Sequence, residues 1–128
     1  MANVFVSHRG SDLSEAERLA REVRGAGHTV WLDAWAIGPG DSIPGRMNEG
    51  LREADYLLLC YSSSGVESPW MAREWMSTLA RQLDGSRGKI LPVLLTGGAP
   101  PPILADLKYV DLTASWAAGV AEILKAIR

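Results

Sequence analysis

The sequence predicts a doubly wound α/β fold, in which five parallel strands form one sheet with helices on both faces. Short apolar runs alternate along the chain with segments whose apolar residues recur at helical spacing. The run Tyr56–Tyr61 (YLLLCY) is apolar throughout, which is typical of a central strand covered on both sides. Because parallel strands need right-handed crossovers, we expect successive β-α units within a single domain of residues 1–128.

The first half of the chain supplies three strands and two helices. The strands are predicted at Asn3–Ser7, Thr29–Asp33 and Tyr56–Tyr61. Asp12 begins the helix between the first two strands, with Glu15 as its capping-box partner, and the glycines from Gly25 to Gly27 end it. A glycine- and proline-bearing loop follows from Ala34 to Asp41, and Ser42 caps the second helix.

The second half of the chain supplies the remaining elements. The third helix runs from Ser68 to about Leu83. Ile90–Leu95 is the fourth strand, and Pro92 within it favours an edge position or a bulge. Tyr109–Leu112 is the last strand, and a closing helix follows with an apolar face from Trp116 to Ile127.

Composition removes several classes of function. A net charge of −2 gives no electrostatic argument for binding nucleic acid or an anionic membrane, and no run of about 20 apolar residues could span a bilayer. The single Cys60 lies in an apolar run, which predicts a buried thiol in a reducing compartment. The two histidines are far from it in sequence, so we expect no metal site. No charged leader precedes the first strand, so we expect a cytoplasmic protein without a signal peptide.

Ligands of such sheets bind beyond the carboxyl ends of the strands. At that edge the sequence places Ser7 to Gly10 (SHRG), Asp33 with its loop, and the run from Ser62 to Ser64. Trp70 and Glu74, four residues apart at the start of a helix, share one face nearby. A carboxylate beside a flat apolar ring suits cleavage of a sugar–base bond. The acid can accept hydrogen bonds from ribose hydroxyls and stabilise a positively charged ring in the transition state.

Other common chemistries lack their motifs. No G-x-G-x-x-G follows the first strand, and no G-x-x-x-x-G-K-[ST] is present. The third strand ends Cys60-Tyr61-Ser62, without the acceptor Asp of a receiver domain. Ser7, His8 and Asp33 lie near strand ends, but no G-x-S-x-G elbow presents a nucleophile for a triad.

Several side chains at this edge have two open interpretations. Arg9 is either a bidentate phosphate donor or a surface charge, and His8 either contacts a base or is structural. Asp33 either binds ribose hydroxyls or caps its loop. Trp35 and Ile37 either wall the pocket or contact another subunit, because exposed apolar loop residues usually mark an interaction. In a monomer we expect these two side chains to lie in water.

Four segments, VFVSHRGSD, WLDAWAIGPGDSI, YLLLCYSSS and SPWMAREW, together resemble the Toll/interleukin-1 receptor (TIR) domain, in particular its bacterial NAD+-consuming branch. They occur in the family's order and spacing and cover essentially the whole chain. The resemblance implies a flavodoxin-like three-layer sandwich with strand order 2-1-3-4-5. It also implies cleavage of nicotinamide from NAD+, which is a substrate, so no cofactor is expected. In enzymatic members a Glu on the third helix is catalytic, and Glu74 matches that position.

The resemblance also implies a substrate site lined by the loops after the first two strands. Its residues match His8, Arg9, Gly10, Asp33, Trp35, Ile37 and Gly38, which join Ser62 and Trp70 of the predicted crevice. Some members carry a second basic residue at the position of Gly10. TIR domains associate with one another, and bacterial members usually adjoin a sensor module and act in immunity against phage.

Three functions remain open from the sequence. The first is an NAD+ glycohydrolase or cyclase. The second is a non-enzymatic module, since many TIR domains are scaffolds, in which Trp35, Ile37 and helix faces mediate homotypic assembly. The third is an enzyme similar to nucleoside deoxyribosyltransferases, with Glu74 as a covalent nucleophile. Release of nicotinamide from NAD+ separates the first from the others.

Overall fold

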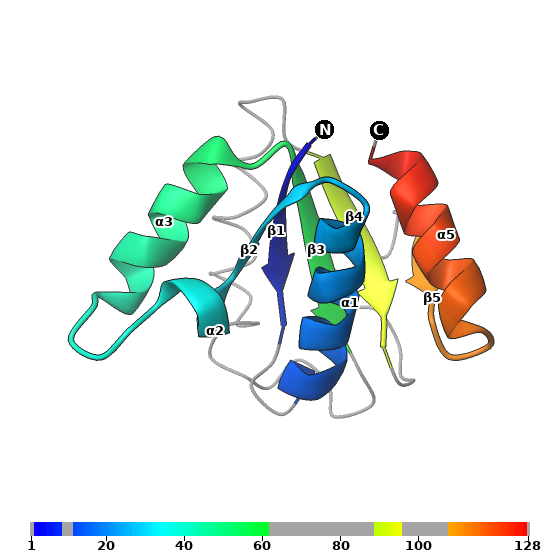
Figure 1. Ribbon diagram of the computed structural model, residues 1–128, viewed down its shortest axis with the longest axis horizontal. Coiled ribbons are helices and arrows are strands. Elements are labelled where there is room, and N and C mark those ends of the chain that lie inside the picture. The colour runs from blue at the N-terminus through cyan, green and yellow to red at the C-terminus, as the bar shows by residue number, and fades with distance from the viewer. Residues whose placement is uncertain (1, 9–11, 62–88, 96–107, 128) are drawn as a thin grey trace.

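A computed structural model describes residues 2–8, 12–61, 89–95 and 108–127 of the chain. Within these residues, five parallel strands form one sheet in the order β2-β1-β3-β4-β5 (Figure 1). The strands are β1 (Asn3–Ser7), β2 (Thr29–Leu32), β3 (Tyr56–Tyr61), β4 (Lys89–Leu94) and β5 (Val110–Asp111). The strand order is that of flavodoxin-like proteins, as predicted.

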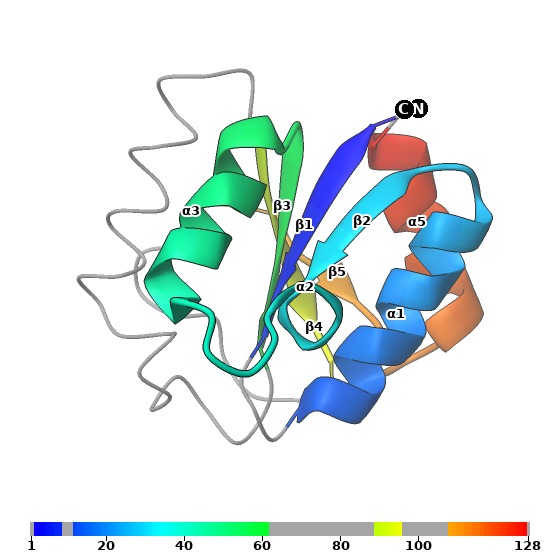
Figure 2. The same ribbon diagram turned by 60° about the vertical axis from the view of Figure 1, so that its left-hand side comes forward.

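Helices cover both faces of the sheet. The described helices are α1 (Leu13–Gly25), α2 (Asp33–Ala36), α3 (Ile43–Glu53) and α5 (Trp116–Ala126). Figure 2 shows α1 and α5 on one side of the sheet and α3 on the other. None of the helices in the described ranges is long and apolar enough to cross a membrane.

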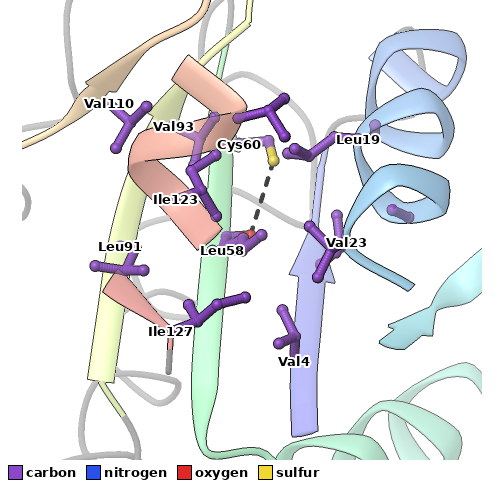
Figure 3. Close-up of a cluster of buried hydrophobic side chains, with 14 of the residues drawn as sticks. Val4, Leu19, Val23, Leu58, Cys60, Leu91, Val93, Val110, Ile123 and Ile127 are labelled. Carbon is purple, nitrogen blue, oxygen red and sulfur yellow. Dashed lines mark hydrogen bonds between the residues drawn. The ribbon is translucent and has the colours of Figure 1, made fainter. Parts of the chain in front are cut away.

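The main core fills the space between the sheet and the helices α1 and α5. Figure 3 shows Leu58 and Cys60 of β3 facing Leu19 of α1 and Ile123 of α5. The thiol of Cys60 is fully buried, and the loss of solvation raises its pKa far above the ordinary value. The prediction that this thiol is buried is confirmed.

A smaller core lies on the α3 face because side chains alternate along a strand. Its fully or nearly buried members are Phe5, Ala54 and Leu57. The ring of Phe5 stacks on Trp31 of β2, with centroids 4.4 Å apart and planes 6° from parallel. Gly50 of α3 packs against the same indole, and a Cβ added at Gly50 would lie 2.9 Å from the ring of Trp31.

The helix ends confirm one predicted cap and contradict another. Asp12 stands at the N-cap of α1, but its side chain makes no capping hydrogen bond, so the predicted capping box is wrong. Ser42 does cap α3, since its Oγ accepts a hydrogen bond from the N–H of Gly45 at 3.2 Å. Gly27, with φ of 101°, adopts the left-handed conformation that ends α1, as predicted.

Pro92 is paired with Leu59 of β3 in the interior of the sheet, so the predicted edge position or bulge is wrong. The carbonyl of Leu94 accepts a 3.0 Å hydrogen bond from Leu112, which follows β5. Because alternate residues of a strand present their backbone groups to the same side, Pro92 also faces β5. The described pairing with β5 begins only at Val93, so the missing N–H of Pro92 removes no bond from it.

The amino edge of the sheet holds both ends of the chain. The N and C ends lie close together in both views, opposite the arrowheads of the strands (Figures 1 and 2). The N–H of Ala2 donates to Nδ1 of His28 at 3.1 Å, and its carbonyl accepts from Thr29 at 2.9 Å. Ala2 and Ile127 are both buried in the main core.

Candidate functional site

The carboxyl ends of β1, β2 and β3 meet at one edge of the sheet, opposite the chain ends. Ser7, the last residue of β1, pairs with Leu59 of β3, and Val6 pairs with Leu32, the last residue of β2. His8 and Asp33 directly follow β1 and β2. The structure therefore brings these predicted site residues to the same edge.

Other predicted site residues lie outside the described residues. These are Arg9, Gly10, Ser62, Trp70 and the catalytic candidate Glu74. Their roles remain predictions from the sequence.

All the polar side chains that are buried in the described residues gather at this edge. Ser7 is 3% exposed, His8 is 6% exposed and Asp12, which precedes α1, is 5% exposed. His8 and Asp12 each interact with neighbouring groups. The hydroxyl of Ser7, in contrast, has no hydrogen-bond partner in the described part of the structure. The sequence places Ser7 at this edge and predicts Asp12 as a helix cap, but it does not predict that either side chain is buried, because burial of a short polar side chain leaves no sequence signal.

Trp35 is packed against the protein, so the expectation that it lies in water is wrong. Asp33–Ala36 form the short helix α2 where a loop was predicted. The ring of Trp35 is half-buried against the main core, and the guanidinium carbon of Arg24 lies 4.4 Å from its centroid. The turn of α2 directs the indole back toward α1 instead of outward.

Ile37 is also packed, on the opposite face of the sheet from Trp35. It lies against the smaller core of Phe5 and Leu57 on the α3 side. The segment after β2 therefore wraps around the edge strand and uses one apolar side chain on each face. The two residues do not form one exposed apolar patch, and an assembly surface built from both is not supported by this arrangement.

Gly38 begins a closed turn that is anchored to α3. Its N–H donates to Oδ2 of Asp41 at 2.9 Å, and the N–H of Asp41 donates to the carbonyl of Gly38 at 3.0 Å. The guanidinium of Arg46 donates twice to the carbonyl of Ala36, at 3.1 and 2.8 Å. Arg46, which the sequence did not single out, thus fixes the end of α2 to α3.

A cavity of about 330 Å³ lies between α2, α3 and the edge strand β2. Its lining comprises Trp31, Ala36, Arg46, Glu49, Gly50, Arg52 and Glu53. The Nη1 of Arg46 donates to Oε2 of Glu49 at 3.0 Å, so part of its charge is balanced internally. Two cationic and two anionic side chains give this cavity no clear preference for an anion or a cation.

A metal centre has no support in the described ranges. No group of three or more His, Cys, Asp or Glu side chains there could hold a metal ion. The buried polar groups that the described residues place at this edge are the hydroxyl of Ser7, the imidazole of His8 and the carboxyl group of Asp12.

Comparisons with known proteins agree on one family. Residues 4–124 match the family described as TIR domain. The chain is 33% identical over 90 residues to the 2' cyclic ADP-D-ribose synthase BtTIR of Bacteroides thetaiotaomicron, covering 70% of this chain and 31% of that protein. It is 29% identical over 92 residues to the NAD(+) hydrolase PdTIR of Paracoccus denitrificans, covering 71% and 30%. The match thus spans about a third of the length of these relatives.

Solved structures show the same fold at lower identity. The TIR domain of the Toll-related receptor TRR-2 from Hydra magnipapillata superposes with a TM-score of 0.77 at 15% identity, covering 100% of this chain and 99% of that one. A metazoan TIR-STING receptor from C. gigas gives a TM-score of 0.79 at 21% identity, covering 99% and 39%.

Proposed function

This chain belongs to the TIR domain family, and from that premise we propose that it cleaves the bond between nicotinamide and ribose in NAD+. The observation that carries the proposal is its similarity to proteins named as an NAD(+) hydrolase and a 2' cyclic ADP-D-ribose synthase. The buried polar side chains at the carboxyl edge of the sheet support it, because that edge is where such sheets bind ligands.

Glu74 is proposed as the catalytic residue. Its carboxylate would accept hydrogen bonds from the hydroxyls of the nicotinamide ribose and stabilise the positive charge that develops on the ring. The electrons of the broken N-glycosidic bond leave with nicotinamide, which departs as a neutral base. Water then attacks the anomeric carbon and loses a proton to solvent, which gives ADP-ribose. Alternatively, a nucleophilic atom of the same molecule attacks that carbon and gives a cyclic product.

The remaining predicted residues would bind and orient NAD+. Arg9 would hold a phosphate oxygen, and Trp70 would provide a flat wall beside the ring that reacts. Trp35 would not contact NAD+ directly. Its ring is packed toward Arg24, so it would act by positioning α2 next to the site. NAD+ is the substrate in this scheme, which needs neither a metal nor a bound cofactor.

We further propose that activity depends on self-association and on a flanking module. The named relatives are about three times as long as the region they share with this chain, so other segments adjoin the domain in those proteins. A sensor or oligomerising segment in such a position could control the distance between TIR domains. We propose that the protein acts in defence against phage in the cytoplasm, because its proposed substrate, NAD+, is a nucleotide of the cell interior.

The test is release of nicotinamide from NAD+ by the concentrated protein, with products separated by chromatography. Glu74→Gln keeps the size of the side chain and removes its charge, so we expect a loss of at least ~100-fold. Glu122→Gln on the exposed surface of α5 is the matched control and should retain full activity. A folded, active Glu74→Gln variant would remove Glu74 from the mechanism. No cleavage by the unsubstituted protein at any concentration would favour a non-enzymatic assembly module.

A further inference from the structure

The hydroxyl of Ser7 is a buried polar group without a hydrogen-bond partner in the part of the chain that the structure describes. The residue is 3% exposed, and its Oγ has no hydrogen bond within the described part of the chain. Burying an unpaired hydroxyl disfavours folding, and alanine would fill nearly the same space without that cost. A serine here is therefore explained more simply by a partner that arrives with a ligand.

The position of Ser7 in the sheet indicates where such a ligand lies. β1 stands between β2 and β3, and the crossovers from β1 to β2 and from β2 to β3 carry the chain in opposite directions across the sheet. In doubly wound sheets the ligand crevice opens at the carboxyl ends of the two strands where this reversal occurs. Ser7 is the last residue of β1 and pairs with Leu59 of β3, directly across that point.

The direction of the side chain follows from the strand. Phe5, two residues earlier, belongs to the smaller core on the α3 face, whereas Val6 belongs to the main core on the α1 and α5 face. Because alternate residues share a face, Ser7 points to the α3 side at the end of the strand. The hydroxyl thus lies at the border between the smaller core on the α3 face and the carboxyl edge of the sheet, where ligands bind.

The chemistry of the hydroxyl limits the group it would bind. A serine hydroxyl both donates and accepts, so a second hydroxyl satisfies it in either orientation. We propose that Ser7 hydrogen-bonds a ribose hydroxyl of the bound dinucleotide and determines affinity for it, a role that rests on the proposed function.

The experiment compares Ser7→Ala with Ser14→Ala, an exposed serine of α1. Steady-state kinetics on NAD+ should show a KM about tenfold higher for Ser7→Ala, with kcat changed much less, because the contact exists in both ground and transition states. Binding of NAD+ measured by calorimetry in the Glu74→Gln background should weaken by a similar factor. The melting temperature of Ser7→Ala without ligand should be equal to or above that of the unsubstituted protein, and Ser14→Ala should change neither KM nor affinity.

The possible results separate this inference from the function on which it rests. Cleavage of NAD+ by the unsubstituted protein with an unchanged KM for Ser7→Ala would overturn the role of Ser7 alone. A Ser7→Ala variant that melts at lower temperature or fails to fold would do the same, because the hydroxyl would then be structural. If the unsubstituted protein neither cleaves nor binds NAD+, the proposed function is overturned, and the proposed ligand of Ser7 is overturned with it.

Discussion

The guanidinium of Arg24 lies over the ring of Trp35, with its central carbon 4.4 Å from the ring centroid. This contact joins the last turn of α1 to the short helix α2 at the edge of the sheet. The guanidinium carbon of Arg18, six residues earlier in α1, lies 4.2 Å from the ring centroid of Trp116 in α5. One helix therefore holds an indole on each side, and the segment after β2 is fixed by a charged contact as well as by the core.

Replacing Trp35 by Ala should destabilise the monomer. The indole is half-buried against the main core, so we expect a loss of ~2 kcal/mol in the free energy of unfolding, roughly half the cost of a fully buried Trp. Arg24→Ala should cost about 0.5–1 kcal/mol, and the double variant less than the sum. Urea denaturation of the four proteins measures this coupling. Arg21→Ala, whose 64% exposed side chain pairs only with Glu17 in the described structure, is the control. Strictly additive losses would contradict a direct contact.

Two glycine-to-alanine changes should shift stability in opposite directions. At Gly50 the added Cβ would be 2.9 Å from the ring of Trp31, which is already stacked on Phe5. Overpacking of about 1–3 kcal/mol should exceed the gain of about 1 kcal/mol in helix propensity, so Gly50→Ala destabilises. At Gly25 nothing lies within 4 Å, and alanine should stabilise by about 0.5–1 kcal/mol. Thermal melts compare the two variants. A higher melting temperature for Gly50→Ala would contradict this prediction, because it would show that the indole of Trp31 moves aside without cost.

Acidic pH should weaken the turn between β5 and α5 through Asp111. Hydrogen bonds from the hydroxyl of Thr113, at 2.5 Å, and from its N–H, at 2.8 Å, lower the pKa of this carboxyl below its ordinary value of 3.8. Because the pKa is lower in the folded state, the stabilisation is present above the unfolded value and is lost as pH falls through the folded one. Melting temperatures between about pH 2 and 6 should fall less steeply for Asp111→Asn. Parallel pH profiles for both proteins would assign the acid sensitivity to other carboxyls.

Specific activity on NAD+ should rise with protein concentration. Association that completes the site would be favoured by mass action, so a dilution series should show disproportionate loss of activity at low concentration. Light scattering on the same samples reports the oligomeric state. Since Trp35 and Ile37 are already packed within one chain, a defect in Trp35→Ala should follow its stability and not its assembly. Constant specific activity from a monodisperse monomer would identify a self-sufficient enzyme.

Periodicity predicted most of the sheet because the strands are short apolar runs between clear breaks. β1 and β3 have the predicted bounds, and β2 ends one residue earlier than expected. The helix α2 was missed because four residues cannot display a helical period. The interior position of Pro92 was missed because it depends on the short length of a neighbouring strand, β5.

The edge that carries the site followed from topology, but the orientation of its side chains did not. Parallel strands place their carboxyl ends together whatever the side chains are, so Ser7, His8 and Asp33 could be grouped from sequence. The packing of Trp35 depends on Arg24 of another helix, and the lack of a hydrogen-bond partner for Ser7 among the described residues depends on several neighbouring elements. Neither leaves a local pattern in the sequence.

The closeness of the two chain ends bears on how this domain can be joined to another. Both emerge at the amino edge of the sheet (Figures 1 and 2), so a linker fused at either end attaches at nearly the same point. A short peptide could bridge the ends in a circular permutant without crossing the ligand edge. In a larger assembly, the domain would be attached at the amino edge of the sheet whether the linker joins the N-terminus or the C-terminus. In both cases the carboxyl edge of the sheet would stay open to small molecules.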